Sequence, residues 1–495
     1  MKQSPYILAI DQGTTSTRAI LFDAGAGPVA QHAIELRQIY PANGWVEHDA
    51  EEIWQTTLAC ARAVMKDMAA SEIAAIGITN QRETSVVWDR ATGVPVHNAI
   101  VWQDRRTADR CRELKKQGWE AKVAAKTGLL LDPYFSATKL QWVLDHTPGA
   151  RARAERGELC FGTIDTWLIY RLTNGKTHAT DVTNASRTML LDLKTLSWDA
   201  EMCELFGVPA AMLPEVRDSD GEFGVAEQLG GIPIRGVAGD QQAAAFGQAC
   251  FKPGDVKSTY GTGCFALVNT GATMPASANR LLATSGYRIG NGKAYAIEGS
   301  IFIAGAVVQW LRDALGVIRS ADEIEALAKT AKPAEGLYFV PAFTGLGAPY
   351  WDPDARGAIL GLTRDMGAAE IARAALDAVC YQTRDLLEAM GRDMKAAGLS
   401  SPAALKVDGG MVRNDWFCQR LADLTGLPVD RPVVTETTAL GAAYLAGLSV
   451  GLFKNTDDIA TRWALDRRFV PSLGQMARDA LYDGWLKVVA RVRSV

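Results

Sequence analysis

The sequence predicts an α/β protein built from two similar halves. Strand-like and helix-like segments alternate along its 495 residues, and that length exceeds what one hydrophobic core normally supports. A Gly/Thr-rich β-hairpin occurs in each half, with Gly13 in one tip and Gly261 in the other, 248 residues apart. This spacing is about half the chain. We therefore expect two domains, residues 1–252 and 253–495, each offering one hairpin to a cleft between them.

The first predicted hairpin spans residues 6–23. Two apolar segments, 6–10 and 18–22, have the length of strands, and Gly13 permits a tight turn between them. The tip also carries Asp11 and four hydroxyl side chains, which are Thr14, Thr15, Ser16 and Thr17.

A phosphate group suits this tip. Hydroxyls and free backbone N–H groups donate to phosphate oxygens, and Asp11 can lie beside a polyphosphate only with a divalent cation between them. Arg18 adds a fixed positive charge. A plain hairpin with a Thr-rich turn explains the stretch equally well. A Walker P-loop is excluded, because neither Gly-Lys-Ser/Thr nor a helix follows.

The first half then supplies candidate substrate-binding residues at strand ends. After a helix over residues 50–68, where Asp49 and Glu52 resemble a capping box, a strand at 73–79 leads to Arg82 and Glu83. A second strand, 94–102, ends at Trp102 before a charged helix. Open α/β sheets bind ligands at the carboxyl ends of their strands, so these three side chains are expected at a substrate site.

Two more segments of the first half carry candidate residues. Residues 127–146 turn before a helix that contains Lys139 and Trp142, and residues 136–138 could cap it. A strand at 232–238 leads to Asp240 at the start of a helix, near the positive end of its dipole.

The second half repeats the hairpin and adds glycines suited to a nucleotide. Its strands, 255–260 and 265–269, flank a Gly/Thr tip. A helix is expected at 301–315, containing Gly305 and Gln309, and a strand–Gly–Gly–helix junction is expected at residues 405–414. Such a junction lets a nucleotide approach backbone N–H groups closely. Tight helix packing explains Gly305, and a plain turn explains the glycine pair, at least as well when each is taken singly.

A dinucleotide-binding oxidoreductase is the weaker alternative. Gly261, Gly263 and Ala266 fit a loose G-x-G-x-x-A pattern after a strand. However, a second strand follows instead of a helix, and no acidic residue lies between Asp255 and Glu298 to hold a ribose.

Composition excludes several other classes of function. The chain is 48% hydrophobic and 22% charged, with a net charge of −4 and no basic run, which argues against a nucleic-acid partner. Its eight cysteines form no metal-ligand spacing and are expected to be reduced thiols in a cytoplasmic protein. No secretion signal is evident, and the most apolar stretch, residues 439–453, is too short to span a membrane and is expected to be a buried helix.

Long motifs along nearly the whole chain resemble those of the glycerol kinases of the FGGY carbohydrate kinase family, within the actin-like ATPase superfamily. They lie at residues 11–16, 77–84, 102–107, 132–142, 239–242, 260–265, 341–351 and 408–410. The resemblance implies two actin-like, ribonuclease H-like domains that close on MgATP, and the conversion of glycerol to sn-glycerol 3-phosphate.

The resemblance also implies a role for each matching residue. The implied ligands of the glycerol hydroxyls are Arg82, Glu83, Tyr134, Asp240 and Gln241, and the implied walls of the pocket are Trp102 and Phe265. The implied phosphate-binding residues are Thr14, Thr15, Ser16 and Thr262, with Arg18 beside them. The implied nucleotide residues are Gly305, Gln309, Gly410 and Asn414, and Asp11 is the implied magnesium-side carboxylate.

These roles agree with the chemistry of a small neutral triol. Recognition requires several aimed hydrogen bonds, with Glu83 and Asp240 accepting and Arg82 donating. We expect Asp240 to take the proton of the attacking hydroxyl, while Mg²⁺, Arg18 and the hairpin N–H groups neutralise most of the charge. A non-catalytic actin-fold ATPase that works as a switch is the alternative, but it has no need for a polyol pocket.

The residues that regulate some kinases of this family are not found in this sequence. Residues 227–233 are shorter than the Gly-rich, Arg-containing loop that binds fructose 1,6-bisphosphate in some of these kinases, and they lack a basic residue. The segment 217–231 contains no His that could be phosphorylated. The sequence therefore supports neither form of control. We expect a homo-oligomer, a dimer or tetramer.

Overall fold

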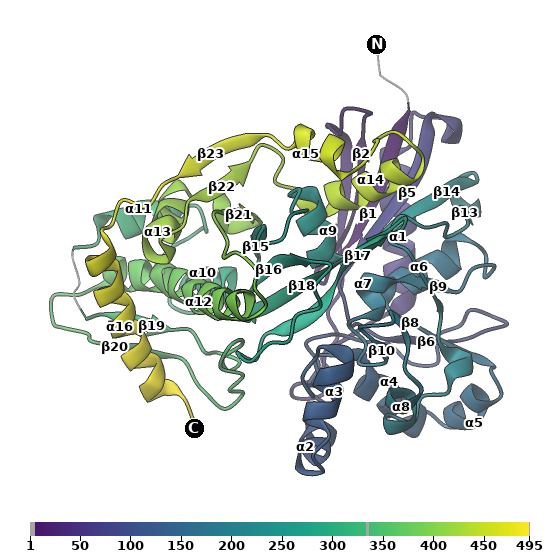
Figure 1. Ribbon diagram of the computed structural model, residues 1–495, viewed down its shortest axis with the longest axis horizontal. Helices are drawn as coiled ribbons and strands as arrows, with labels where there is room; N and C mark the ends of the chain where they lie inside the picture. Colours follow the sequence, from purple (N-terminus) through teal and green to yellow (C-terminus); the bar gives the residue numbers. More distant parts are fainter. Residues whose placement is uncertain (1–4, 333–335, 495) are drawn as a thin grey trace.

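The computed structural model describes residues 5–332 and 336–494, which fold into two lobes, each built on a mixed β-sheet (Figure 1). The first sheet has the order β13-β14-β5-β1-β2-β3, and the second has the order β17-β18-β16-β15-β21-β22-β23. The first-sheet strands are β1 (Tyr6–Gln12), β2 (Ser16–Phe22), β3 (Pro28–Glu35), β5 (Ile73–Asn80), β13 (Val225–Ala226) and β14 (Ile232–Gly239). The second-sheet strands are β15 (Val256–Tyr260), β16 (Cys264–Gly271), β17 (Leu282–Ile289), β18 (Gly292–Ile301), β21 (Leu405–Asp408), β22 (Val429–Pro432) and β23 (Leu465–Phe469).

The two sheets share one strand arrangement. In the first, β1 pairs antiparallel with β2 and β2 with β3, while β1, β5 and β14 run parallel. In the second, β15 pairs antiparallel with β16 and β16 with β18, while β15, β21 and β22 run parallel. The expectation of an α/β chain with two similar halves, each opening on a hairpin, is confirmed.

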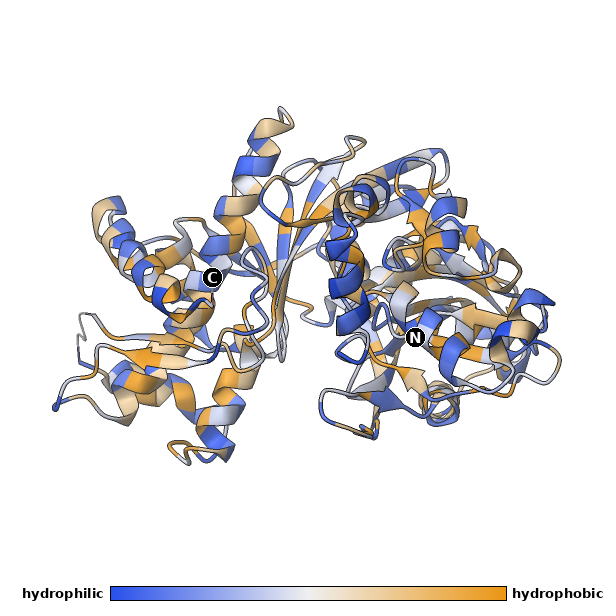
Figure 2. Ribbon diagram, turned by 90° about the horizontal axis from the view of Figure 1, so that it is seen from below, coloured by the Kyte–Doolittle hydropathy of each residue, from blue (hydrophilic) through white to orange (hydrophobic). Residues whose placement is uncertain are grey.

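Helices flank both sheets, and hydrophobic residues concentrate in the strands and in bands along the helices (Figure 2). In the first lobe the larger helices are α1 (Ala50–Val64), α2 (Ala108–Lys116), α3 (Glu120–Thr127), α4 (Ser136–His146), α6 (Ile164–Leu172) and α9 (Asp240–Gly247). In the second they are α10 (Gly305–Asp313), α11 (Glu323–Thr330), α12 (Ala368–Ala396), α13 (Asp415–Thr425) and α16 (Gln475–Val492). Two short strands, β6 (Val86–Asp89) and β7 (Ala99–Ile100), precede α2.

One helix crosses between the lobes. α14 (Thr437–Ser449) follows β22 of the second lobe, but it packs against α9, β5, β14 and β1 of the first (Figure 1). Glycines allow the close approach: a Cβ on Gly441 would lie 1.8 Å from the Ala243 carbonyl oxygen, and one on Gly77 would lie 2.2 Å from that of Ala442. The expectation of a buried helix in this stretch is confirmed.

Some predicted elements differ from the observed ones. The strand expected at 94–102 is reduced to β7, because Pro95 donates no backbone hydrogen bond and the flanking Val94 is exposed. The helix expected from residue 301 begins at Gly305, because β18 continues its pairing as far as Ile301.

Helix caps were predicted only in part. Asp49 caps α1 by accepting from the backbone N–H groups of Glu51 and Glu52, at 2.8 and 3.4 Å. The Glu52 carboxylate accepts instead from the Arg37 backbone N–H at 2.9 Å, so no reciprocal capping box forms. Ser136 does not cap α4, since its hydroxyl donates to the Glu83 carbonyl at 3.0 Å.

All eight cysteines are buried and unpaired. Among residues 5–332 and 336–494, no helix has the length and apolar character needed to cross a membrane.

Candidate active site

The tip of the first hairpin places Asp11 beside other charged groups. β1 and β2 are joined through Gly13, whose N–H donates to the Ser16 carbonyl at 2.9 Å. Burial raises the pKa of Asp11 to about 6; Arg18 opposes this, and the Asp240 and Glu436 carboxylates add to it. Arg18 forms an ion pair with Glu436 at the start of α14, a partner that no sequence pattern indicated.

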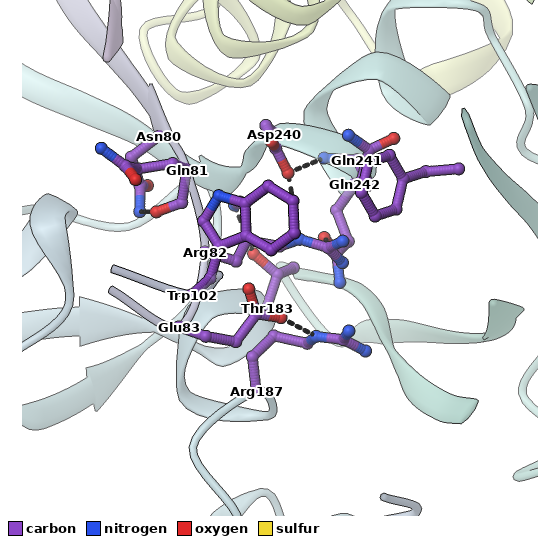
Figure 3. Close-up of polar contacts among 12 residues, drawn as sticks. Asn80, Gln81, Arg82, Glu83, Trp102, Thr183, Arg187, Asp240, Gln241 and Gln242 are labelled. Atoms are coloured by element: carbon purple, nitrogen blue, oxygen red, sulfur yellow. Dashed lines mark hydrogen bonds and ion pairs between the residues drawn. The ribbon is translucent and has the colours of Figure 1, made fainter. Parts of the chain in front are cut away.

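Asp240 occupies the junction of β14 and α9, as predicted (Figure 3). Its Oδ1 accepts from the Gln241 backbone N–H at 2.7 Å and forms an ion pair with Arg82 Nε at 3.0 Å. The Arg82 side chain is 2% exposed, whereas that of Asp240 is 31% exposed. Asp240 is therefore the member of this pair that an incoming molecule can reach. The preceding Gly239 N–H is fixed by the Thr183 hydroxyl at 2.8 Å.

Behind Asp240 lies a buried network of two arginines and two glutamates. Arg82 contacts Glu298 through both terminal nitrogens, at 2.5 and 3.1 Å. Arg187 donates from Nε to Glu83 at 2.6 Å and from Nη2 to Glu298 at 2.9 Å. Burial acts to raise the pKa of Glu298, but Arg187 and Arg82 outweigh it and hold that pKa below its ordinary value. Burial dominates at Glu83, whose pKa is raised.

The backbone of Glu83 is held in an unusual conformation. Its φ is +62°, a left-handed value that is strained for a side chain of this size. The buried Lys139 ammonium donates to the carbonyls of Tyr134 at 2.5 Å and Phe135 at 3.1 Å, and it reaches that of Glu83 at 3.5 Å. Burial lowers the pKa of Lys139 to about 8. These contacts fix the strained backbone of Glu83.

Aromatic rings enclose the space in front of Asp240. The Trp102 ring centroid lies 5.6 Å from that of Tyr134 and 6.0 Å from that of Phe265, which belongs to the second hairpin. Trp102 Nε1 donates to the Thr14 hydroxyl at 2.8 Å. The two hairpins thus meet at this wall.

Gln241 does not point freely into this space. Its side-chain oxygen accepts from Lys257, a buried amine on β15 whose pKa is lowered by burial. The same amine donates to the Thr259 hydroxyl at 3.0 Å.

A second cavity, of about 470 Å³, opens beside the second hairpin. The predicted nucleotide residues all line it, together with the tip of the hairpin: Gly261, Thr262, Gly305, Gln309, Gly410 and Asn414. The Gly305 N–H donates to the Gly261 carbonyl at 2.8 Å, which joins α10 to the hairpin tip. A Cβ on Gly410 would have no atom within 4 Å, so its backbone faces open space. Thr15 and Ser16 lie on the other hairpin, with Thr15 exposed.

The carboxylates of the site are too few to bind a divalent cation without ligands from phosphate or water. Among the residues that the structure describes, no group of three or more His, Cys, Asp or Glu is arranged to hold a metal ion. Asp11 is a hard oxygen donor whose pKa is raised mainly by burial and further by the nearby Asp240 and Glu436 carboxylates. A magnesium ion here would complete its shell with phosphate oxygens and water.

Sequence reasoning placed Arg82, Glu83, Trp102 and Asp240 in one site but missed Arg187 and Glu298. Arg187 lies in a loop with no recognisable motif. Glu298 carried a usable signal, because an acidic residue within the apolar strand β18 is rarely buried without a partner.

Two repeated sheets, whose hairpins meet through Trp102, Thr14 and Phe265, define a two-lobed kinase of the actin-like ATPase fold. Models of the FGGY family of carbohydrate kinases match this chain at residues 6–247 for the N-terminal domain and 256–450 for the C-terminal domain. The chain belongs to the FGGY family of carbohydrate kinases.

Similar proteins include a glycerol kinase of Ectopseudomonas mendocina, 60% identical and covering 99% of both chains, and one of Sinorhizobium fredii, 59% identical and covering 98% of both. The crystal structure of Plasmodium falciparum glycerol kinase with ADP superposes with a TM-score of 0.91 at 35% identity, covering 99% of this chain and 98% of the other. A gluconate kinase from Lactobacillus acidophilus superposes with a TM-score of 0.86 at 23% identity over 98% and 97% of the two chains, which shows the fold alone.

Proposed function

We propose that this chain is a glycerol kinase, which transfers the terminal phosphoryl group of ATP to glycerol and releases ADP and sn-glycerol 3-phosphate. One observation carries the proposal. Asp240, the reachable carboxylate of a buried charge network, lies close enough to Asp11 on the first hairpin and to Lys257 on the second to act on the pKa of both groups. The full-length relatives at about 60% identity support glycerol as the substrate.

The pocket explains how a small neutral alcohol would be recognised. Arg187 donates to Oε1 of Glu83, and no other residue that the structure describes donates to this carboxylate, so Oε2 can accept from a hydroxyl. Arg82 donates three of its five N–H groups to Gln242 and Glu298, and its Nε forms an ion pair with Asp240, which leaves one N–H on Nη2 to donate to a substrate oxygen. Trp102 and Phe265 cover the carbon chain.

Phosphoryl transfer depends mostly on positioning and charge neutralisation. Asp240 accepts the proton of the terminal hydroxyl as that oxygen attacks the phosphorus atom, and the arginine behind it holds the carboxylate in place. Thr14, Thr262 and the N–H groups of the two tips orient the phosphates. Magnesium, held on the side of Asp11, neutralises phosphate charge when bound. Gly305, Gln309, Gly410 and Asn414 receive the rest of the nucleotide.

A coupled ADP-release assay with glycerol, dihydroxyacetone, xylulose and gluconate tests the substrate, with phosphorus NMR identifying the product. We expect glycerol to be preferred and its product to be phosphorylated on a terminal carbon. ATP hydrolysis that is independent of glycerol and gives no phosphorylated alcohol would instead favour an ATPase switch.

We also propose the finer assignments. The N-terminal domain, to residue 252, holds the alcohol and the first hairpin, and the C-terminal domain holds the second hairpin and the nucleotide. The enzyme works in the cytoplasm, in keeping with its eight buried, unpaired thiols. It forms a homo-oligomer, which light scattering coupled to gel filtration will measure.

A further inference from the structure

We propose that Glu298 is a positioning residue that fixes Arg82 on Asp240 and Arg187 on Glu83, and thereby makes the pocket selective for a molecule carrying all three hydroxyls. The inference rests on the proposed function. It assigns a specificity role to a residue of the second sheet that lies outside the pocket.

Glu298 cannot contact a substrate itself. Its side chain is fully buried, and both oxygens are occupied by guanidinium groups: Oε2 by Arg82 at 2.5 Å, and Oε1 by Arg82 at 3.1 Å and Arg187 at 2.9 Å. Each of these arginines then extends a further nitrogen to a different carboxylate, Asp240 or Glu83. Among the residues that the structure describes, Glu298 is therefore the one that forms ion pairs with both arginines, and so it links Asp240 to Glu83.

Charge makes this link necessary. Arg82 and Arg187 are both buried; burial and the charge of Arg82 act to lower the pKa of Arg187, but the Glu298 and Glu83 carboxylates outweigh them and raise it. Without a carboxylate between them, the two cations would separate, and each would take its attached acid along. Removing one partner from a buried charge network leaves the others uncompensated.

The link also spans the two lobes. Glu298 lies on β18 opposite Leu282 of β17, while Arg82, Arg187, Glu83 and Asp240 belong to the first lobe. Nearby, the Thr284 hydroxyl bonds to the Ser186 hydroxyl at 2.9 Å and accepts from the Gln242 amide at 3.2 Å. The β17–β18 hairpin is thus attached to the first lobe beside Glu298, so the second lobe contributes the group that holds the alcohol-binding residues in register.

Selectivity is the property that this positioning controls. A pocket whose polar groups are held rigidly binds an analogue that lacks a hydroxyl weakly, because those groups stay unpaired. If the groups can rotate to other partners, the analogue loses less binding free energy. The informative comparison is glycerol against propane-1,2-diol.

The test replaces Glu298 by Gln in the full-length enzyme. We expect the KM for glycerol to rise by at least about ten-fold, the KM for ATP to stay within about two-fold, and the kcat/KM preference for glycerol over propane-1,2-diol to fall by at least about ten-fold. Arg187→Lys, which keeps the charge but cannot reach both glutamates, should lower the preference similarly.

A matched control is Asp377→Asn. Asp377 pairs with Arg420 of α13 through two contacts of 2.7 and 3.0 Å, in a largely buried position on α12 and away from the pocket. We expect this variant to lose thermal stability but to keep the wild-type preference. ADP binding measures the folded fraction of each variant.

Unchanged glycerol KM and preference in folded Glu298→Gln or Arg187→Lys would overturn the inference, as would a loss of stability with kinetics like those of the control. Failure of the wild-type enzyme to phosphorylate any of the alcohols would instead overturn the proposed function.

Discussion

At the scale of residues, exposure separates acidic side chains that have similar chemistry. Asp240 and Glu298 both contact Arg82, but the first is 31% exposed and the second is fully buried. Only an exposed carboxylate can exchange a proton with a bound hydroxyl. We therefore propose the proton transfer for Asp240 and a positioning role for Glu298.

Replacing Asp240 by Asn tests this assignment. The amide oxygen can still accept from Arg82 and from the Gln241 N–H, so folding and ATP binding should persist, but no group remains to take the proton. We expect kcat to fall by about 10²- to 10⁴-fold with little change in melting temperature or in the KM for ATP. Turnover near the wild-type rate would remove Asp240 from the role of base.

Asp11 should make the ligand-free protein less stable above pH 6. Burial raises its pKa from 3.8 to about 6, so the folded state binds a proton more tightly than the unfolded state between these values. The contribution is present below pH 3.8 and is lost as pH rises through 6. Each pKa unit corresponds to about 1.4 kcal/mol, which sets an upper limit of about 3 kcal/mol, lowered by solvent access to this partly exposed side chain.

Asp11→Asn in EDTA should therefore unfold at a higher urea concentration than the wild type at pH 7.5, and this gain should shrink towards pH 4. The same variant should lose magnesium-dependent turnover. A gain that is independent of pH would contradict the argument.

Sequence alone located the site residues that follow strands, such as Arg82 and Asp240, because a strand end fixes where a side chain emerges. It could not locate Arg187, which follows no motif. Glu298 stood out only as an acidic residue in the apolar strand β18, and no local pattern identified its partners on the other lobe.

At the scale of elements, the cavity beside the second hairpin depends on two glycines with different surroundings. A Cβ on Gly305 would lie 2.6 Å from the Gly261 carbonyl oxygen, whereas one on Gly410 would meet no atom within 4 Å. The first glycine lets α10 approach the hairpin tip, and the second leaves room in the cavity.

The variants Gly305→Ala and Gly410→Ala should therefore differ. Gly305→Ala should destabilise the protein by about 1–3 kcal/mol through overpacking. Gly410→Ala should leave thermal unfolding of the free enzyme unchanged and raise the KM for ATP, because its methyl group occupies space meant for the nucleotide. Gly474→Ala, at an open position before α16, should change neither property. Equal KM values for Gly410→Ala and Gly474→Ala would argue against nucleotide binding in this cavity.

Elements with strong periodicity were predicted well, including α1 and the strands of both hairpins. The failures occurred where tertiary pairing decided the outcome. β18 continued to Ile301 because β16 lies beside it, and Pro95 limited a stretch that looked like a strand. Hydrophobic pattern alone cannot report either effect.

At the scale of the whole molecule, α14 makes the two lobes interdependent. Its glycine contacts with α9 and β5 are too close for any side chain. Gly441→Ala should lower the free energy of unfolding by about 1–3 kcal/mol or more, while Thr438→Ala on the same helix should lower it much less.

Urea unfolding followed by circular dichroism and by tryptophan fluorescence should give one shared midpoint for the full chain. Separate transitions for the two probes would contradict this coupling.

The position of α14 also sets an order of events during synthesis. β14 ends at Gly239, but the helix that covers its sheet begins at Thr437, so the ribosome must add roughly 200 residues between them. At about 5–20 residues per second, the apolar face of the first sheet stays exposed for on the order of 10–40 s before α14 can pack on it. The nascent chain therefore emerges with a half-finished lobe, and its yield in the cell should depend on chaperones that shield that face until translation nears its end.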